Sequence, residues 1–246
     1  MSRENKTLIP IRRTATEVKR YRVLMKIVPA AIIVSALVLI VGYVVSALYM
    51  RFGAFTVSIN KFDNLDYSLT LSESRGFESF SSRLNAEISE TITNIDGETL
   101  PPYLDNIDGT HNGDNYVAYT FYFKNTGEKS VDYSYELYIT NMTLDIEKAV
   151  RVRLYVDGEY TDYAYPRTDG IEGPEPGTVA FQTGNTIVKK VVRNFAPEAI
   201  TKYTIVIWLE GNDPDCVDKI LGGEFKIDMT LEVVGEAATD ITNSAT

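Results

Sequence analysis

The sequence predicts an all-β fold, an antiparallel two-sheet sandwich of the jelly-roll or immunoglobulin-like kind, preceded by one transmembrane helix. Three observations predict it. Residues 27–50 carry no charged side chain. The chain that follows alternates apolar and polar residues, as half-buried strands do. Tyr and Phe, which favour strands, number 16 and 10.

The uncharged segment is long enough to cross a membrane. Its 24 residues would form a helix of about 36 Å, against a hydrocarbon core of about 30 Å. A helix satisfies every backbone group internally, which lipid requires. We therefore expect residues 27–50 to be a membrane anchor. A cleaved signal peptide, cut near Ala47, is the alternative, but the apolar run exceeds the usual length of such a segment.

Charge changes sign across this segment. Residues 1–26 hold eight basic and two acidic side chains, a net charge of +6, whereas residues 52–246 hold 15 basic and 32 acidic ones, a net charge of −17. Basic flanks stay in the cytoplasm. We therefore predict a plasma-membrane protein with a cytoplasmic segment 1–26, an extracellular sandwich over 51–234 and a disordered polar tail over 235–246.

The strands are expected in a series of short runs with turn signals between them. The runs cover residues 54–59, 67–72, 116–124, 131–140, 150–156, 159–165, 178–181, 186–192, 202–209 and 224–234. The pairs 116–124 with 131–140, and 150–156 with 159–165, are separated by turn residues and predict hairpins. The run 202–209 is apolar on both faces and predicts a central strand.

Two further segments complete the prediction. Phe80, Leu84 and Ile88 are spaced at four residues, which indicates a short surface helix as one interpretation. Residues 166–178 are rich in Pro and Gly and predict a loop.

The composition excludes several classes of function. One Cys and one His allow neither an intramolecular disulfide nor a zinc site made of several Cys or His ligands. The acidic balance argues against nucleic acid as a partner. No G-x-S-x-G motif accompanies His111, which is expected to lie in a surface loop. Trp208 is expected in the core, and Cys216 is expected to be buried beside a turn.

The segment from Asp105 to Asn115 gathers three Asp, three Asn and the single His. Oxygen ligands on a turning loop suit Ca²⁺, so Asp105, Asp108, Asn112 and Asp114 are the candidate ligands of a calcium site. The spacing differs from that of an EF-hand. A solvated turn between strands is the simpler interpretation, because Asp, Asn and Gly dominate turns.

The pattern resembles one group of exported proteins. An apolar N-terminal segment is followed by residues 53–57 (GAFTV) and 69–73 (LTLSE), and the body carries 115–119 (NYVAY) and 208–216 (WLEGNDPDC). This looks like the TasA and camelysin group of Gram-positive bacteria. The resemblance implies a jelly-roll-like sandwich, and assembly into matrix fibres or a surface metalloprotease activity. The retained anchor would hinder donation of an N-terminal strand, and no zinc-ligand motif is present.

Three hypotheses for the function follow. The first is a non-enzymatic cell-surface protein, anchored through residues 27–50, whose sandwich serves envelope structure, adhesion or matrix assembly, with itself or another envelope component as partner. The second is a metal-dependent surface hydrolase centred on the segment from Asp105 to Asp114. The third is a ligand-binding sensory ectodomain. Ca²⁺ is the one candidate cofactor.

Overall fold

A computed structural model describes residue 25 and residues 27–29, 31–43, 54–60, 68–87 and 92–236. The chain divides into two compact units, residues 1–52 and 53–246. Within the first unit, residues 31–43 are helical. No helix in the described part of the chain has the length and apolar character needed to span a membrane. Residues 30 and 44–50 of the proposed anchor, the cytoplasmic segment apart from residue 25, and the tail from residue 237 lie outside the described residues.

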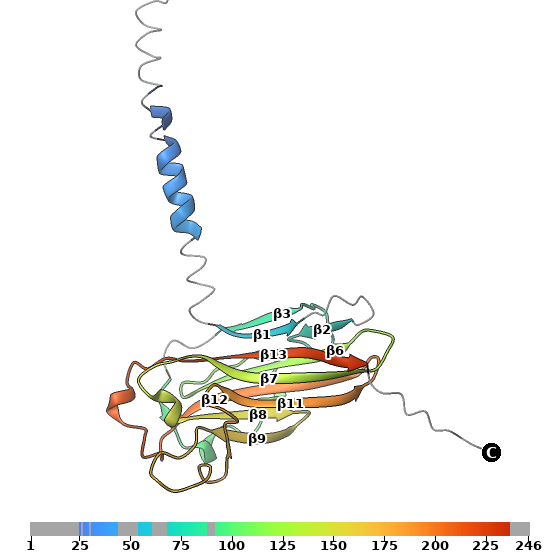
Figure 1. The fold of residues 1–246 in the computed structure, drawn as a ribbon, viewed down its shortest axis with the longest axis vertical. Helices are drawn as coiled ribbons and strands as arrows, with labels where there is room; N and C mark the ends of the chain where they lie inside the picture. Colours follow the sequence, from blue (N-terminus) through green and yellow to red (C-terminus); the bar gives the residue numbers. More distant parts are fainter. Residues whose placement is uncertain are drawn as a thin grey trace, which may run out of the picture. The chain divides into compact units, whose positions relative to one another are not determined.

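The second unit is a sandwich of two β-sheets that pack face to face (Figure 1). The smaller sheet has the strand order β11-β7-β13-β1-β3. Its strands are β1 (Ala54–Asn60), β3 (Arg83–Glu87), β7 (Val131–Met142), β11 (Thr186–Phe195) and β13 (Phe225–Glu236).

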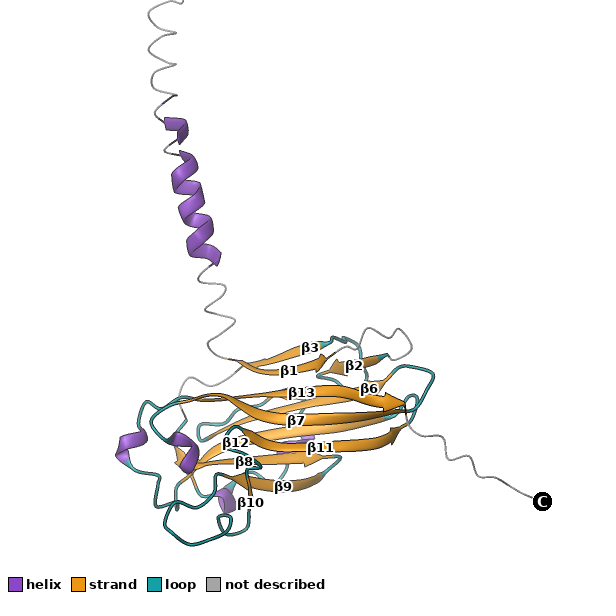
Figure 2. Cartoon of the chain, in the orientation of Figure 1, coloured by secondary structure: helices purple, strands orange, loops and turns teal. Residues whose placement is uncertain are grey.

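The larger sheet has the order β10-β9-β8-β12-β6-β2, with β4 beside β12 and β5 beside β6. Its strands are β2 (Leu69–Ser72), β4 (Asn94–Ile95), β5 (Gly109–Thr110), β6 (Tyr116–Asn125), β8 (Val150–Val156), β9 (Glu159–Ala164), β10 (Val179–Ala180) and β12 (Ile200–Glu210). Four short 3₁₀ helices lie in loops of this unit (Figure 2): η1 (Gly97–Thr99), η2 (Leu104–Asn106), η3 (Ile146–Lys148) and η4 (Asp218–Ile220).

The core lies between the sheets and is rich in aromatic rings. Inward residues alternate along each strand, so that Phe121 and Phe123 of β6 meet Tyr133 of β7 from the opposite sheet. Phe123 and Tyr133 pack edge to face with ring centroids 4.8 Å apart. The hydroxyls of Tyr133 and Tyr203 share a hydrogen bond of 2.8 Å inside the core. The alternation that predicted the strands is therefore confirmed as the pattern of burial.

Three features of the predicted topology are wrong. The sheets are mixed, because β1 pairs with β13, β9 with β10 and β4 with β12 in parallel. Alternation fixes which residues share a face but carries no information on strand direction. The runs 116–124 and 131–140 form no hairpin, because β6 and β7 belong to different sheets and the turn between them crosses the sandwich. The hairpin of β8 and β9 is confirmed.

The predicted helix around Phe80 is the third correction. Residues 83–87 form strand β3, which pairs antiparallel with β1. Leu84 lies opposite Val57, whereas Phe80 is 74% exposed. Pairing with β1 therefore overrides the local spacing. Residue 88 lies outside the described part, and β13 extends to residue 236, two residues beyond the predicted domain boundary.

Candidate functional site

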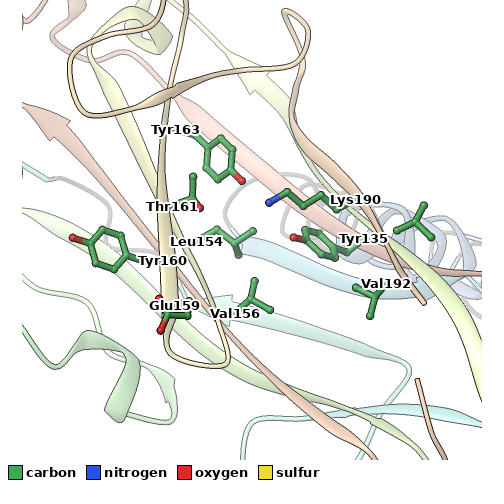
Figure 3. A pocket seen from close by; sticks show the side chains of 10 residues that line it. Tyr135, Leu154, Val156, Glu159, Tyr160, Thr161, Tyr163, Lys190 and Val192 are labelled. Atoms are coloured by element: carbon green, nitrogen blue, oxygen red, sulfur yellow. The ribbon is translucent and has the colours of Figure 1, made fainter. Parts of the chain in front are cut away.

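A hollow lies at the open edge of the sandwich, between β11 of one sheet and β9 of the other. Its volume is about 280 Å³. The lining residues come from four strands: Tyr135, Leu154, Val156, Glu159, Tyr160, Thr161, Tyr163, Lys190, Val191 and Val192. Figure 3 shows Tyr135, Tyr163 and Lys190 directed toward a common space. The opposite edge is joined, because Leu71 and Ser81 form a bridge between the segments of β2 and β3.

The hollow offers hydrogen-bond donors above an apolar floor. Leu154 and Val156 supply apolar surface, and Lys190 supplies an exposed ammonium group. Burial raises the pKa of the Tyr135 phenol, and the neighbouring Tyr163 and Tyr133 raise it further, so this hydroxyl stays protonated at neutral pH. The arrangement suits a small ligand with acceptor oxygens and one apolar side.

Two of the predicted calcium ligands, Asp105 and Asp108, contact outward residues of the larger sheet. Asp105 forms an ion pair of 3.0 Å with Lys202, and the Lys202 ammonium also donates to the Asp105 carbonyl at 2.7 Å. Asp108 accepts a hydrogen bond of 2.6 Å from the Tyr122 hydroxyl. Burial raises the pKa of Tyr122 to about 12, and Asp108 adds to the shift. Both carboxylates are therefore engaged by strand residues.

The other two predicted ligands make contacts within their own part of the chain. The Asn112 side-chain oxygen accepts from the Ala118 amide at 3.0 Å. The Asp114 carbonyl oxygen accepts from the Thr93 amide at 3.3 Å. Among the described residues, no three His, Cys, Asp or Glu side chains are grouped to hold a metal ion. An Asn side chain and backbone oxygens could also bind Ca²⁺. The calcium site therefore stays a prediction.

A second apolar cluster explains why this segment lies on the sheet. Leu100 and Leu104 precede the acidic stretch and are buried against Val206 and Trp208 of β12. Their burial fixes the whole connection from β4 to β5 across the outer face. Trp208 is 2% exposed, which confirms its predicted place in a core. The Trp208 indole donates to Glu210 at 3.0 Å.

His111 and Cys216 occupy half-buried positions. The His111 Nδ1 atom lies 2.9 Å from the Gly109 carbonyl, and its Nε2 is buried without a hydrogen-bond partner among the described residues. The Cys216 sulfur accepts from the Asn94 side-chain amide at 3.6 Å. Neither geometry places a nucleophile beside a base.

A buried ionic network at one end of β8 is not predicted from the sequence. Arg151 is 5% exposed and pairs with Asp213, while Glu175 lies 3.8 Å away. The two acids come from separate loops, so the network ties both loops to β8. Alternation on β8 predicts that Arg151 points away from the core between the sheets. Arg151 is buried because the two loops cover it. Arginines on the outer face of an apolar strand, followed by acidic loops, were the available signal.

Arg153, two residues along β8, makes a second missed cluster. Its guanidinium binds Asp162 through two hydrogen bonds, of 2.6 and 2.9 Å. The same group lies 4.2 Å from the Tyr160 ring centroid and 5.5 Å from that of Trp208. A guanidinium held by a carboxylate and two rings is a rigid structural contact.

No protein-family model matches this chain, and comparison with curated proteins gives no match.

Proposed function

We propose that this protein is a single-pass membrane protein with a cytoplasmic N-terminus and an extracellular, non-catalytic sandwich that serves envelope structure or adhesion. One observation carries the proposal: a 24-residue uncharged run separates a segment of charge +6 from a body of charge −17. The run is long enough to span the hydrocarbon core as a helix. The sandwich has its own core within residues 53–246, as expected of a domain that folds apart from the anchor.

The connection between the proposed anchor and the sandwich is short. Strand β1 begins at Ala54, and only residues 51–53 separate it from the end of the uncharged run. Three residues reach at most about 10 Å. Phe55 and Val57 are buried in the core, so β1 is an integral strand. The sandwich would therefore stay close to the membrane surface, as a structural or adhesive module on a short tether.

The strand edges favour a tethered module over a fibre subunit. Edge strand β11 carries the exposed Lys189, Lys190 and Arg193, and its pairing with β7 has two irregularities. Lysines and bulges on an edge oppose pairing with another chain. The short β10 covers part of the β9 edge, and β2 and β3 have four and five residues. Strand addition would have to overcome these features.

A topology experiment tests the proposal. The variant Cys216→Ser removes the native thiol, and Glu128→Cys or Ser2→Cys then places one thiol in the sandwich or in the N-terminal segment. A membrane-impermeant maleimide should label Glu128→Cys on intact cells, and Ser2→Cys only after permeabilisation. The protein should also stay with the membrane in alkaline carbonate. The opposite labelling pattern, or release by carbonate, would refute the proposal.

A ligand-binding ectodomain is the second candidate, because of the hollow of about 280 Å³ beside Lys190 and Tyr163. A thermal-shift screen of soluble envelope polysaccharide fragments would test it. A fragment that stabilises the native chain but not Lys190→Ala would support binding in the hollow. Equal shifts in the two proteins would place the binding elsewhere.

A further inference from the structure

The two ends of the sandwich differ in the residues that their loops expose. At one end, the β6–β7 turn (residues 126–130) and the β8–β9 turn (residues 157–158) contain no large apolar side chain, whereas Phe80 in the neighbouring β2–β3 loop is 74% exposed. At the other end, the β7–β8 loop and the β12–β13 loop expose such residues. These are Met142, Leu144, Val217 and Leu221, which are 36%, 53%, 44% and 74% exposed. We name these four residues the apolar tip.

The leucines of the apolar tip contribute little to the fold. Leu221 is the most exposed of the four, at 74%, and follows η4 directly. Leu144 has a φ of 58°, in the left-handed region. That conformation is strained for a non-glycine residue, and folding alone would favour Gly or Asn there. An exposed leucine at such a position indicates a role outside the folded core.

The two loops are held together. The Thr143 amide donates to the Glu224 carbonyl at 3.0 Å, and the Glu224 amide donates to the Thr143 hydroxyl at 2.8 Å. Gly223 packs so closely that an added Cβ would lie 3.1 Å from the Ile146 Cβ and 2.9 Å from the Ile220 carbonyl oxygen. The leucines therefore stand on two loops that form one rigid support.

The apolar tip is at the end where the sandwich joins the proposed anchor. Strand β1 runs parallel to β13, with Thr56 opposite Asp228, so both strands begin at this end (Figure 1). Phe225, the first residue of β13, pairs with Met142 of the tip. Leu221 precedes Phe225 by four residues. The three residues before Ala54 reach about 10 Å at most, which keeps this end of the domain near the bilayer.

We propose that the apolar tip inserts into the outer surface of the lipid bilayer and fixes the orientation of the sandwich. The inference rests on the proposed membrane anchor. Lipid is the occupant that the short connection brings within reach of this end. The charges beside the tip are mixed and net acidic: Asp145 lies 3.3 Å from Lys148 and 3.9 Å from Lys219, and the β12–β13 loop adds Asp215, Asp218 and Glu224. Burial of apolar surface, rather than charge attraction, would then drive insertion.

Fluorescence quenching in vesicles tests the inference. The full chain with Cys216→Ser is reconstituted into phosphatidylcholine vesicles that contain some lipid with a nitroxide on its acyl chain. Single thiols in Leu144→Cys, Leu221→Cys and Glu128→Cys carry an environment-sensitive fluorophore. Glu128 is the matched control, because the β6–β7 turn lies at the other end of β7, about 36 Å away.

We expect the labels at 144 and 221 to be quenched about twofold, because interfacial side chains reach roughly 5–10 Å into the headgroup and acyl boundary. The label at 128 should be unaffected. Leu221 has an ordinary φ of −60°, so its substitution adds no backbone strain. Equal quenching at all three positions, or none at 144 and 221, would overturn the inference.

Flotation of the same vesicles separates this result from failure of the anchor. Protein that floats with the vesicles while its tip labels stay unquenched retains the anchor but not the inserted tip. Protein that fails to float refutes the anchor and, with it, the inserted tip.

Discussion

The buried pair of Arg151 and Asp213 gives the sharpest test of what holds the loops to the sandwich. The two residues are 5% and 7% exposed. Arg151 also donates to the carbonyls of Lys148 and Val150, at 3.3 and 3.2 Å. The variant Asp213→Asn removes one charge while keeping an oxygen that accepts from the Asp215 amide, a bond of 2.7 Å in the native chain. The amide nitrogen of Asn then takes the place of Oδ2, so the change removes both the charge and the acceptor that Arg151 uses.

The expected loss follows from the burial of the pair. Removal of one partner from a buried ion pair costs about 3–5 kcal/mol, because the other charge is left without compensation. Glu175 remains 3.8 Å from Arg151. Burial and the Asp213 charge raise the pKa of Glu175, so loss of that charge favours its ionised form. This partial compensation places the expected loss of unfolding free energy at about 3 kcal/mol. Such a loss lowers the unfolding midpoint of a domain this size by roughly 6–12 °C.

Urea denaturation of the sandwich, followed through the fluorescence of its single tryptophan, measures this loss. The matched control is Glu136→Gln, because Glu136 pairs with Lys189 at 2.8 Å on the surface, where the Lys189 side chain is exposed and that of Glu136 is partly exposed. A surface pair contributes only about 0.2–1 kcal/mol. Equal losses in Asp213→Asn and Glu136→Gln would refute the reasoning that burial makes the first pair strong.

Four further predictions concern stability. Tyr133→Phe should cost about 1–3 kcal/mol, because it leaves the buried Tyr203 hydroxyl without its partner, and Tyr133→Phe combined with Tyr203→Phe should cost less than the sum of the single losses. Burial raises the pKa of Asp228 in the folded protein, so the protonated carboxyl stabilises the fold at low pH. This stabilisation is lost as the pH rises from 3.8, the ordinary pKa of the group, through the raised pKa. Asp228→Asn should remove this loss and raise the unfolding midpoint at neutral pH. Gly223→Ala should lower the free energy of unfolding by about 1–3 kcal/mol, since backbone atoms block its Cβ. If residues 105–115 bind Ca²⁺, saturating Ca²⁺ should raise the midpoint by mass action.

Each of these predictions has a control or a contradicting result. Strictly additive losses in the two tyrosine variants would contradict the shared hydrogen bond. A midpoint of Asp228→Asn that follows the native pH profile would contradict its raised pKa. Gly184→Ala is the control for crowding, because an added Cβ there meets no atom within 4 Å. An unchanged midpoint at saturating Ca²⁺ would count against the calcium site.

The strands were predictable because burial on one face leaves a period of two in the sequence. Val150, Val152 and Leu154 face the core as their alternation predicts. The partition of strands between sheets was not predictable by the same means. A two-residue turn such as Asp157-Gly158 gives a hairpin, whereas the five-residue turn between β6 and β7 can either pair its strands or carry the chain across the core. Only the complete set of pairings decides between these.

The candidate sites show the same limit more sharply. The acidic segment was predicted as a unit because its residues are adjacent in sequence, but Asp105 and Asp108 contact partners outside the segment. Asp105 pairs with Lys202, which lies 97 residues away, and Asp108 with Tyr122. The sequence predicts a central strand over 202–209, but it does not indicate which segment covers the outward residues of β12 and β6.

Burial of Leu100 and Leu104 against Trp208 explains why the acidic segment takes that place. Apolar contacts bring the connection onto the sheet, and the charges then pair with the polar residues that alternate with the apolar ones on the outer face. The pairing of Asp105 with Lys202 is thus a consequence of the leucines upstream of it. The position of an acidic cluster between two strands therefore has a structural explanation wherever an apolar residue nearby in sequence can pack on the outer face of a sheet. In this protein, that explanation accounts for the contacts of Asp105 and Asp108 without a bound ion.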